Sequence, residues 1–452
     1  MNNGKEFLGT EPVKKLLFRL ALPTVAAQII NMLYNVVDRI FIGHIEGYGN
    51  LALTGVGICM PIIMIVSAFA ALVASGGAPR ASIFLGKGDK EKAERTLGAC
   101  FTLQIVISVI LTAVLLIWSR DFLLAFGASN NTIKYAEEYM KIYAIGTLFV
   151  QLTLGMNAFV TAQGFTKIST LSVAIGAIAN IILDPVFIYA LDMGVKGAAL
   201  ATVISQFFSC IWLLLFLFGR KATLRLRVKN FKPLPSLVLP CIALGSATFI
   251  MQASESVITV CFNSSLLKYG GDIAVGAMTI LASVMQFAML PMQGFAQGAQ
   301  PILSYNYGAR NPDRIKSTFK LLLAVCLAYS VTLWLSIMIF PRAFAAMFTS
   351  DMALLNYTEG VIRIYFGGLI IFGIQIACQM AFVSFGNAPS SILVAVVRKF
   401  VLLLPLIYII PAMVENKALG VYMAEPIADV IAVTFTAVLF VFQFRRAIRK
   451  IK

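Results

Sequence analysis

The chain has 452 residues, of which 60% are hydrophobic and only 12% are charged, and its mean hydropathy of +0.88 is far above that of a soluble domain. These values exclude an ordinary soluble globular protein and indicate a protein that lives in a bilayer. The net charge of +16 does not indicate nucleic-acid binding, because the chain lacks a basic soluble domain and most of its Lys and Arg residues lie in short loops between apolar runs.

Apolar runs of about 20 residues, the length that spans the hydrocarbon core of a bilayer, occur at regular intervals along the chain. In the first half we place their starts near Leu16, Leu51, Leu97, Tyr135, Thr170 and Ala198. In the second half we place their starts near Leu237, Ile273, Phe319, Tyr357, Ser391 and Leu419. The sequence therefore predicts an all-α integral membrane protein with 12 transmembrane helices.

The two halves repeat one another at a fixed spacing of 222 residues, without a gap. The identical positions in the first half are Ala52, Gly76, Pro79, Ser82, Gly86, Thr96, Tyr135, Glu137, Ile142, Tyr143, Gly146 and Gly164. Their counterparts are Ala274, Gly298, Pro301, Ser304, Gly308, Thr318, Tyr357, Glu359, Ile364, Tyr365, Gly368 and Gly386. A duplicated membrane module is the usual architecture of a secondary transporter, whose substrate site lies between the halves. The alternative is a duplicated scaffold without transport.

The topology follows from the even number of predicted spans in each module. Both modules then enter and leave the membrane on the same side, as parallel repeats. Lys and Arg are concentrated in one alternating set of loops that includes both termini, so we expect this set to be cytoplasmic. We predict an N-terminal six-helix bundle over residues 1–219, a cytoplasmic basic linker over residues 220–235, and a C-terminal six-helix bundle over residues 236–452.

The first predicted span carries a stripe of polar side chains. At about 100° per residue, one face of the helix carries Gln28, Asn31, Asn35 and Asp38. Tyr34 lies one turn before Asp38 and is close enough to hydrogen-bond to its carboxylate. An acid inside a span is costly unless it faces a cavity or a partner, so function is the default interpretation. The alternative is that Asp38 lies at the outer interface as an ion pair with Arg39.

The fifth predicted span repeats this pattern. Asn180 and Asp184 lie one turn apart on the same face, and Pro185 follows directly. Pro185 frees a backbone carbonyl one turn earlier, near Ile181, and interrupted helices of this kind bind cations in transporters. A proline kink capped by its neighbour explains these residues equally well.

The sixth predicted span adds a hydroxyl and an amide to one helix face, because Ala198, Thr202 and Gln206 follow one another at i,i+4 positions. The alternative is a structural role, since Thr and Gln also join helices within membranes.

The second half has fewer polar residues inside its predicted spans. Glu255 lies in the seventh span, within the run Phe249–Phe262, which contains no basic residue. It can carry a proton or face a cationic substrate, and the alternative is a structural hydrogen bond in its protonated form. Arg398 and Lys399 of the eleventh span are expected to snorkel or to line the inner cavity. Soft side chains that suit either organic ligands or plain helix packing cluster in the eighth span: Met285, Phe287, Met289, Met292 and Phe295.

The chain has few residues in arrangements that could catalyse a reaction. His44 is the only histidine, and the seven cysteines lie singly inside apolar runs. The sequence contains no zinc-ligand pattern, no paired nucleophile and base, and no phosphate-binding GxxxxGK[ST] loop. We therefore expect no enzyme and no resident cofactor, and any pumping must draw on an ion gradient.

Three segments of the sequence are arranged as in a known family. They are Val37-Asp38-Arg39-Ile40-Phe41-Ile42-Gly43-His44 after Leu22-Pro23, the repeated Gly-x-x-Pro with a glycine seven residues after the proline, and Asn180-x-x-x-Asp184-Pro185 followed by Gly197-Ala198-Ala199. With these segments the whole chain resembles the multidrug and toxic compound extrusion (MATE) family, in particular its bacterial branch that exports cationic drugs in exchange for sodium ions or protons. The resemblance implies a V-shaped pair of six-helix bundles in the bacterial cytoplasmic membrane.

The resemblance also implies where ligands bind. A cation site in the N-terminal bundle maps onto Asp38, Asn180, Asp184 and Thr202, with the carbonyl of Ala198. In the coupling or substrate cavity, the resemblance implies Asn157 of the fourth span and Glu255. From the helix faces described above we also assign to this cavity Tyr34, Gln28, Asn31, Gln206, Met285 and Met289. One branch of the family pairs the glutamate of the seventh span with an aspartate of the tenth span in a second sodium site, but the run Ile362–Ser384 contains no acid.

We therefore expect a secondary active multidrug efflux transporter that exports lipophilic organic cations by antiport with Na⁺ or H⁺ through alternating access. Its expected partners are small organic cations, the coupling ion and membrane lipid, without nucleic acid, and we expect a monomer. One alternative is a flippase for a lipid-linked precursor of the related superfamily. A flippase for phosphate-bearing lipids needs a strongly cationic cavity, whereas the only basic residues within the spans are Lys141, Arg363, Arg398 and Lys399. A non-transporting receptor or scaffold is the other alternative.

Overall fold

The structure is a computed structural model that describes residues 7–451, and this part of the chain is helical, without a strand. The first half contains α1 (Phe7–Thr10), α2 (Val13–Gly43), α3 (Gly49–Gly86), α4 (Lys90–Ala125), α5 (Ile133–Ala162), α6 (Thr166–Pro185), the π-helical turn η1 (Val186–Ala190) and α7 (Gly194–Phe218). The connector that follows contains only the short 3₁₀ helix η2 (Val228–Asn230).

The second half begins with a helix of 74 residues, α8 (Pro235–Gly308). The remaining helices are α9 (Pro312–Ile339), α10 (Pro341–Ala346), α11 (Met352–Tyr365), η3 (Phe366–Gly368), α12 (Leu369–Ser384), α13 (Ala388–Val396), the π-helical segment η4 (Val397–Leu403), α14 (Leu404–Met413) and α15 (Lys417–Ile451). The backbone of α8 is not helical at Gly271, where φ is 68°, a value that glycine adopts without strain. This residue divides α8 into a first limb (residues 235–270) and a second limb (residues 272–308).

Within residues 7–451, eleven helical stretches are long and apolar enough to cross a membrane. One of the eleven is α8, which is too long for a single crossing and supplies two spans through its two limbs. The prediction of an all-α membrane protein with 12 spans is confirmed.

The helices of the two halves start in the register that the sequence repeat predicts. The helix α2 begins at Val13 and α8 at Pro235, while α6 begins at Thr166 and α13 at Ala388, both pairs at the 222-residue spacing. The first limb of α8 is therefore the counterpart of α2. By the same register, α13 with η4 is the counterpart of α6, and α15 is the counterpart of α7.

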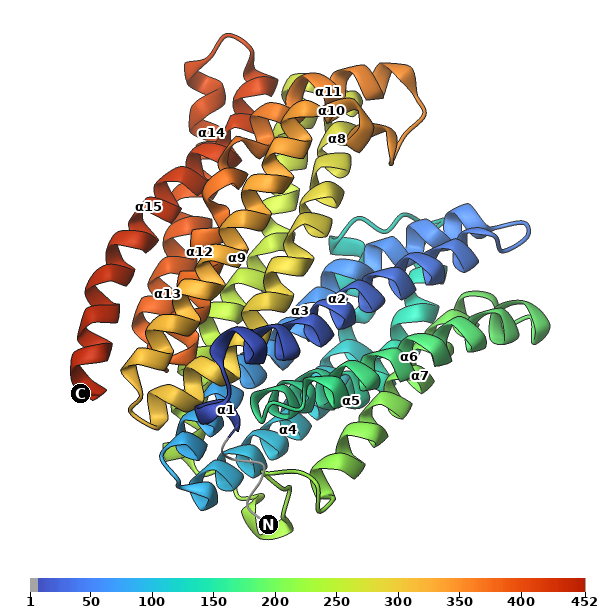
Figure 1. The fold of residues 1–452 in the computed structure, drawn as a ribbon. Coiled ribbons are helices and arrows are strands. Elements are labelled where there is room, and N and C mark those ends of the chain that lie inside the picture. The colour runs from blue at the N-terminus through green and yellow to red at the C-terminus, as the bar shows by residue number, and fades with distance from the viewer. Residues whose placement is uncertain (1–6, 452) are drawn as a thin grey trace.

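The helices form two lobes, which we call the N-lobe (α2 to α7) and the C-lobe (α8 to α15). The lobes meet at the end where α1 and the last turns of α15 lie, and they diverge toward the other end in a V shape (Figure 1). The start of the chain is anchored on the C-lobe, because Arg314 and Asn306 donate hydrogen bonds of 3.0 and 2.9 Å to the carbonyl oxygen of Leu8. Leu16 and Leu17 of α2 are buried in the same core as residues of the C-lobe.

Repeated glycines bring the lobes into close contact. Gly76 of α3 lies so close to the Cys241 carbonyl of α8 that a Cβ atom at this position would overlap it. At its repeat counterpart, Gly298 of α8, a Cβ atom would likewise overlap the backbone of Ala21 in α2. Small residues permit such close approach of helices within a membrane, so part of the identity between the halves is explained by the lobe interface.

Candidate functional site

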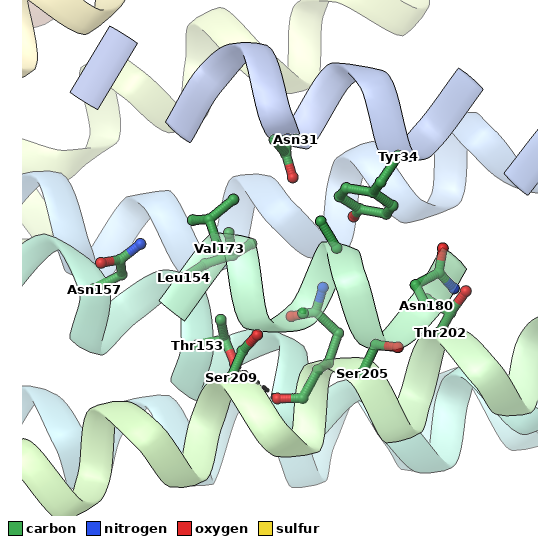
Figure 2. A pocket seen from close by; sticks show the side chains of 13 residues that line it. Asn31, Tyr34, Thr153, Leu154, Asn157, Val173, Asn180, Thr202, Ser205 and Ser209 are labelled. Atoms are coloured by element: carbon green, nitrogen blue, oxygen red, sulfur yellow. Dashed lines mark hydrogen bonds between the residues drawn. The ribbon is translucent and has the colours of Figure 1, made fainter. Parts of the chain in front are cut away.

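A polar pocket lies inside the N-lobe, between α2, α5, α6 and α7. It is lined by Asn31, Tyr34, Thr153, Leu154, Asn157, Val173, Gly176, Ala177, Asn180, Thr202, Ser205, Gln206 and Ser209. Asn31 and Tyr34 point into it from α2, while Asn180, Thr202 and Ser205 lie on its far side (Figure 2). Its volume is about 40 Å³. That is room for roughly three water molecules, so the pocket suits a small ion with its water rather than a drug-sized molecule.

Two carboxylates lie beside this pocket. Asp184 of α6 is fully buried and Asp38 of α2 is 6% exposed, and the two carboxylates are near neighbours without a hydrogen bond between them in the described residues. Asn180 lies one turn before Asp184 and donates a hydrogen bond of 3.2 Å to its Oδ1 atom. Arg39 is exposed and forms no ion pair within residues 7–451. The alternative of an interfacial Asp38–Arg39 pair is therefore wrong.

The chain around Asp184 departs from α-helical geometry. Pro185 has no backbone N–H to donate to the preceding turn, and the π-helical turn η1 follows it directly. The Tyr189 hydroxyl of η1 donates a hydrogen bond of 2.6 Å to the Phe41 carbonyl, which fixes this turn against α2 near Asp38. On the other side, a Cβ at Gly197 of α7 would lie only 2.6 Å from the Phe187 backbone, so glycine is needed for α7 to approach η1.

Six oxygen atoms in this region are buried without a hydrogen-bonding partner. They are Asp38 Oδ1, Asp184 Oδ2, Asn180 Oδ1, Asn157 Oδ1, Gln206 Oε1 and Ser205 Oγ. Buried polar atoms are nearly always satisfied, and oxygens from carboxylates, amides and hydroxyls are the ligands that hard cations prefer. Among the described residues no group of three or more His, Cys, Asp or Glu side chains could hold a metal ion, so this donor set suits Na⁺ or a proton better than a transition metal.

The remaining residues of the expected cation site lie nearby. Thr202 lines the pocket. Ala198 lies one turn before Thr202 on α7 and is fully buried. Within the described residues Tyr34 forms no hydrogen bond to Asp38, contrary to the sequence-based expectation. Tyr34 of α2 and Gln206 of α7 both line the pocket.

A second group of charged side chains lies inside the C-lobe. Arg398 forms ion pairs with Asp429 at 2.8 Å and with Glu425 at 3.2 Å, and Lys399 forms one with Glu255 at 2.6 Å. One prediction is wrong here, because Arg398 and Lys399 neither snorkel nor line a cavity: their side chains are 8% and 4% exposed. Glu255, whose own run contains no basic residue, has a basic partner that comes from a distant span.

Comparison with known proteins places the chain in a family. The sequence model of the MatE family matches residues 23–186 and, a second time, residues 247–409. The chain belongs to the MatE family. One match lies in each lobe, as expected of a duplicated module.

This MATE protein is similar to named multidrug exporters and to MATE proteins of known structure. The multidrug export protein MepA of Staphylococcus haemolyticus is 24% identical over 434 residues, which cover 95% of this chain and 94% of that protein. A crystal structure of a MATE in the bent conformation has a TM-score of 0.93 at 22% identity and covers 100% of this chain and 99% of its own. A MATE family transporter of the MOP superfamily in an outward-facing conformation has a TM-score of 0.91 at 22% identity and covers 99% of both chains. Both structures have the same two-lobe fold.

The chain is thus a multi-pass MATE transporter and not an enzyme.

Several expected cavity residues lie away from the N-lobe pocket. Gln28 of α2 donates a hydrogen bond of 3.1 Å to Gln297 of α8 and so joins the two lobes. Met285 and Met289 pack, half-buried, against the hydrophobic core of the C-lobe. Glu255 belongs to the charged group of the C-lobe described above.

The sequence analysis missed two acids of this MATE protein, Glu425 and Asp429. Both lie inside the last apolar run, one helical turn apart, which is the same signal that singled out Asn180 and Asp184. Two acids at i,i+4 spacing in one span and two adjacent bases in another are a signal that the spans pair.

Proposed function

We propose that this MATE protein exports lipophilic organic cations in exchange for Na⁺ or H⁺, by alternating access. The observation that carries the proposal is the pair of buried acids in the N-lobe, Asp38 and Asp184, which has no basic partner among the described residues. A negative charge inside a membrane protein needs compensation, so this pair favours an incoming cation or proton. The relatives named multidrug export proteins support a broad range of organic substrates.

Coupling follows from the position of these acids. Binding of a monovalent coupling ion compensates one negative charge of the Asp38–Asp184 pair, and it fixes α2, α6 and α7 to one another through Asn180 and Thr202. Substrate release then requires only that the ion favour a conformation in which the substrate binds weakly. The coupling free energy is limited by the difference between the ion's binding free energies in this conformation and in the one that binds substrate tightly. Ion and substrate therefore need not occupy the same site.

For the cellular setting, we propose a monomer in the bacterial cytoplasmic membrane with both termini in the cytoplasm. The concentration of Lys and Arg in the loops on the side of the termini supports this orientation. The alternative of a flippase for a lipid-linked precursor is less favoured, because Arg398 and Lys399 are already neutralised by acids of the C-lobe and leave no excess positive charge for phosphates.

The test is transport by the purified protein in liposomes. A fluorescent lipophilic cation is followed under an imposed sodium gradient and, separately, under a proton gradient. We expect flux under one of them, which identifies the coupling ion, and we expect Asp38→Asn to abolish it. The control is Glu46→Gln, the same change at an exposed loop residue beyond the same helix, which should transport normally. Undiminished gradient-driven flux by Asp38→Asn would refute the role of Asp38.

A further inference from the structure

The charged group of the C-lobe lies on the helices that are the repeat-related counterparts of those of the N-lobe site, although at other positions along them. Glu255 lies on the first limb of α8, Lys399 and Arg398 lie on η4, and Glu425 and Asp429 lie on α15. By the 222-residue register these elements correspond to α2, α6 and α7, which carry Asp38, Asp184 and Thr202. The same three helices therefore hold a polar group at the centre of each lobe.

The two groups differ in one chemical respect. In the N-lobe, the two acids have no basic partner among the described residues, whereas in the C-lobe three acids are paired with two cations of the protein itself. In the C-lobe the positive charges are side chains of the protein, whereas the N-lobe pocket would bind a cation from solution. With three carboxylates and two cations, it has a formal charge of −1 when all its members are ionised.

Arg398 is held firmly in this group. Its Nε atom donates to Asp429 at 2.9 Å and its NH2 atom donates to Glu425 at 3.2 Å. Its guanidinium also lies 4.7 Å from the ring centre of Phe372. A planar guanidinium with two acceptors and an aromatic face has little freedom to move, so we regard Arg398 as structural.

Lys399 is held at one point only, by Glu255. The Lys399 side chain is 4% exposed, whereas the Glu255 side chain is 45% exposed. The Glu255 side chain is therefore partly accessible, while the Lys399 side chain is not. A lysine is a point charge on a flexible stem, and a second acid, Glu425, pairs at 3.2 Å with Arg398, the residue next to Lys399 in the chain. Lys399 thus has an alternative acidic partner deeper in the lobe.

We infer that Lys399 is a tethered counter-cation, which the positively charged group of a substrate displaces from Glu255 and which then pairs with Glu425. This inference rests on the proposed export of organic cations and assigns Lys399 as the residue that sets their affinity. Because Lys399 stays in the lobe, binding of a monocation changes the formal charge of the ion-paired group from −1 to 0, and the buried ammonium keeps a partner throughout. Substrate binding is then a competition between the substrate cation and the side chain of Lys399.

Two substitutions should change substrate affinity in opposite directions. Lys399→Gln removes the competitor, so the affinity for a lipophilic monocation should increase by about tenfold, as expected for one partly desolvated charge pair. Glu425→Gln removes the alternative partner, so Lys399 leaves Glu255 less readily and the affinity should fall. Lys399→Arg, which keeps a cation beside Glu255, should bind more weakly than Lys399→Gln. If the Lys399–Glu255 ion pair were merely structural, all these variants would bind the cation more weakly than the wild type.

The experiment measures equilibrium binding of a fluorescent lipophilic monocation to the full-length protein, in detergent and in liposomes. Tetraphenylphosphonium serves as the unlabelled competitor. Elution as a single species in size-exclusion chromatography checks folding of each variant. Lys141→Gln is the matched control, because Lys141 also pairs with a glutamate, Glu137, at 2.8 Å but is exposed. The double variant Glu255→Gln/Lys399→Gln should bind no more tightly than Glu255→Gln alone, since removal of the competitor has no effect without the carboxylate.

An unchanged or weakened affinity of folded Lys399→Gln would overturn the inference. If that variant does not fold, an affinity of Glu425→Gln equal to or above wild type would overturn it instead. Failure of the proposed function itself is a distinct result: the wild-type protein would then neither bind nor transport the cation under either gradient.

Discussion

The N-lobe site depends on a few atoms of Asp38, Asp184 and Asn180. The Asn180 amide donates to one oxygen of Asp184 and leaves its own carbonyl oxygen without a donor. Asn180 therefore orients Asp184 and also adds an acceptor to the set. A neutral side chain with both functions lets the site gain ligands for a cation without adding a third negative charge to the membrane interior.

Asn180→Ala should weaken binding of the coupling ion by about tenfold, because one hydrogen bond to a charged group and one acceptor are lost together. The measurement is the ion concentration that gives half-maximal efflux in liposomes. The maximal rate at saturating ion should be less affected than this concentration. Asn50→Ala, at an exposed position in the first turn of α3, is the control and should leave both values unchanged. An unaltered ion dependence in Asn180→Ala would show that Asn180 is not a ligand.

At the scale of single elements, the interrupted helix α6–η1 is the distinctive feature of the N-lobe. The sequence predicted the interruption from Pro185, whereas the convergence of α2, α6 and α7 at one site was implied by the resemblance to the MATE family and not by helical spacing. It could not predict the ion pairs of the C-lobe, because Glu255, Arg398 and Asp429 come from three spans whose contacts depend on packing and not on periodicity. The acids of α15 and the adjacent bases of η4 indicate that these spans pair, but helical spacing does not show which acid contacts which base.

The hydrogen bond that ties η1 to α2 gives a prediction for this element. Tyr189→Phe keeps the ring, which lies 6.3 Å from that of Phe41, and loses only the hydroxyl. We expect a loss of about 1 kcal/mol in stability and slower ion-driven efflux, because η1 is freer to move away from Asp38. Thermal unfolding and liposome flux measure the two effects. Tyr269→Phe, an exposed tyrosine of the C-lobe, is the control, and equal flux of the two variants would contradict the prediction.

At the scale of the whole molecule, the repeat determines both lobes and their interface. The 222-residue register predicted two equivalent bundles, and the starts of α2, α6, α8 and α13 follow it. The angle between the lobes could not be predicted from that register alone, since it depends on how closely backbones approach at a few crossings. Gly76 with Cys241 and Gly298 with Ala21 are two such crossings, related to one another by the repeat. Identical residues in the two halves therefore serve the contact between lobes, while the polar residues that differ give each lobe its own chemistry.

A methyl group at one of these crossings should push the lobes apart without unfolding them. In Gly76→Ala the new Cβ would overlap the backbone carbonyl of Cys241, and a backbone atom cannot turn aside as a flexible side chain can. We expect a lower unfolding temperature and a strongly reduced efflux rate, with helix content retained by circular dichroism. Gly57→Ala is the matched control on the same helix, because a Cβ at Gly57 meets nothing within 4 Å, and alanine there should be neutral or stabilising. If Gly76→Ala transported as well as Gly57→Ala, close contact at this crossing would not be required for the change between conformations, and the lobes would move about other contacts.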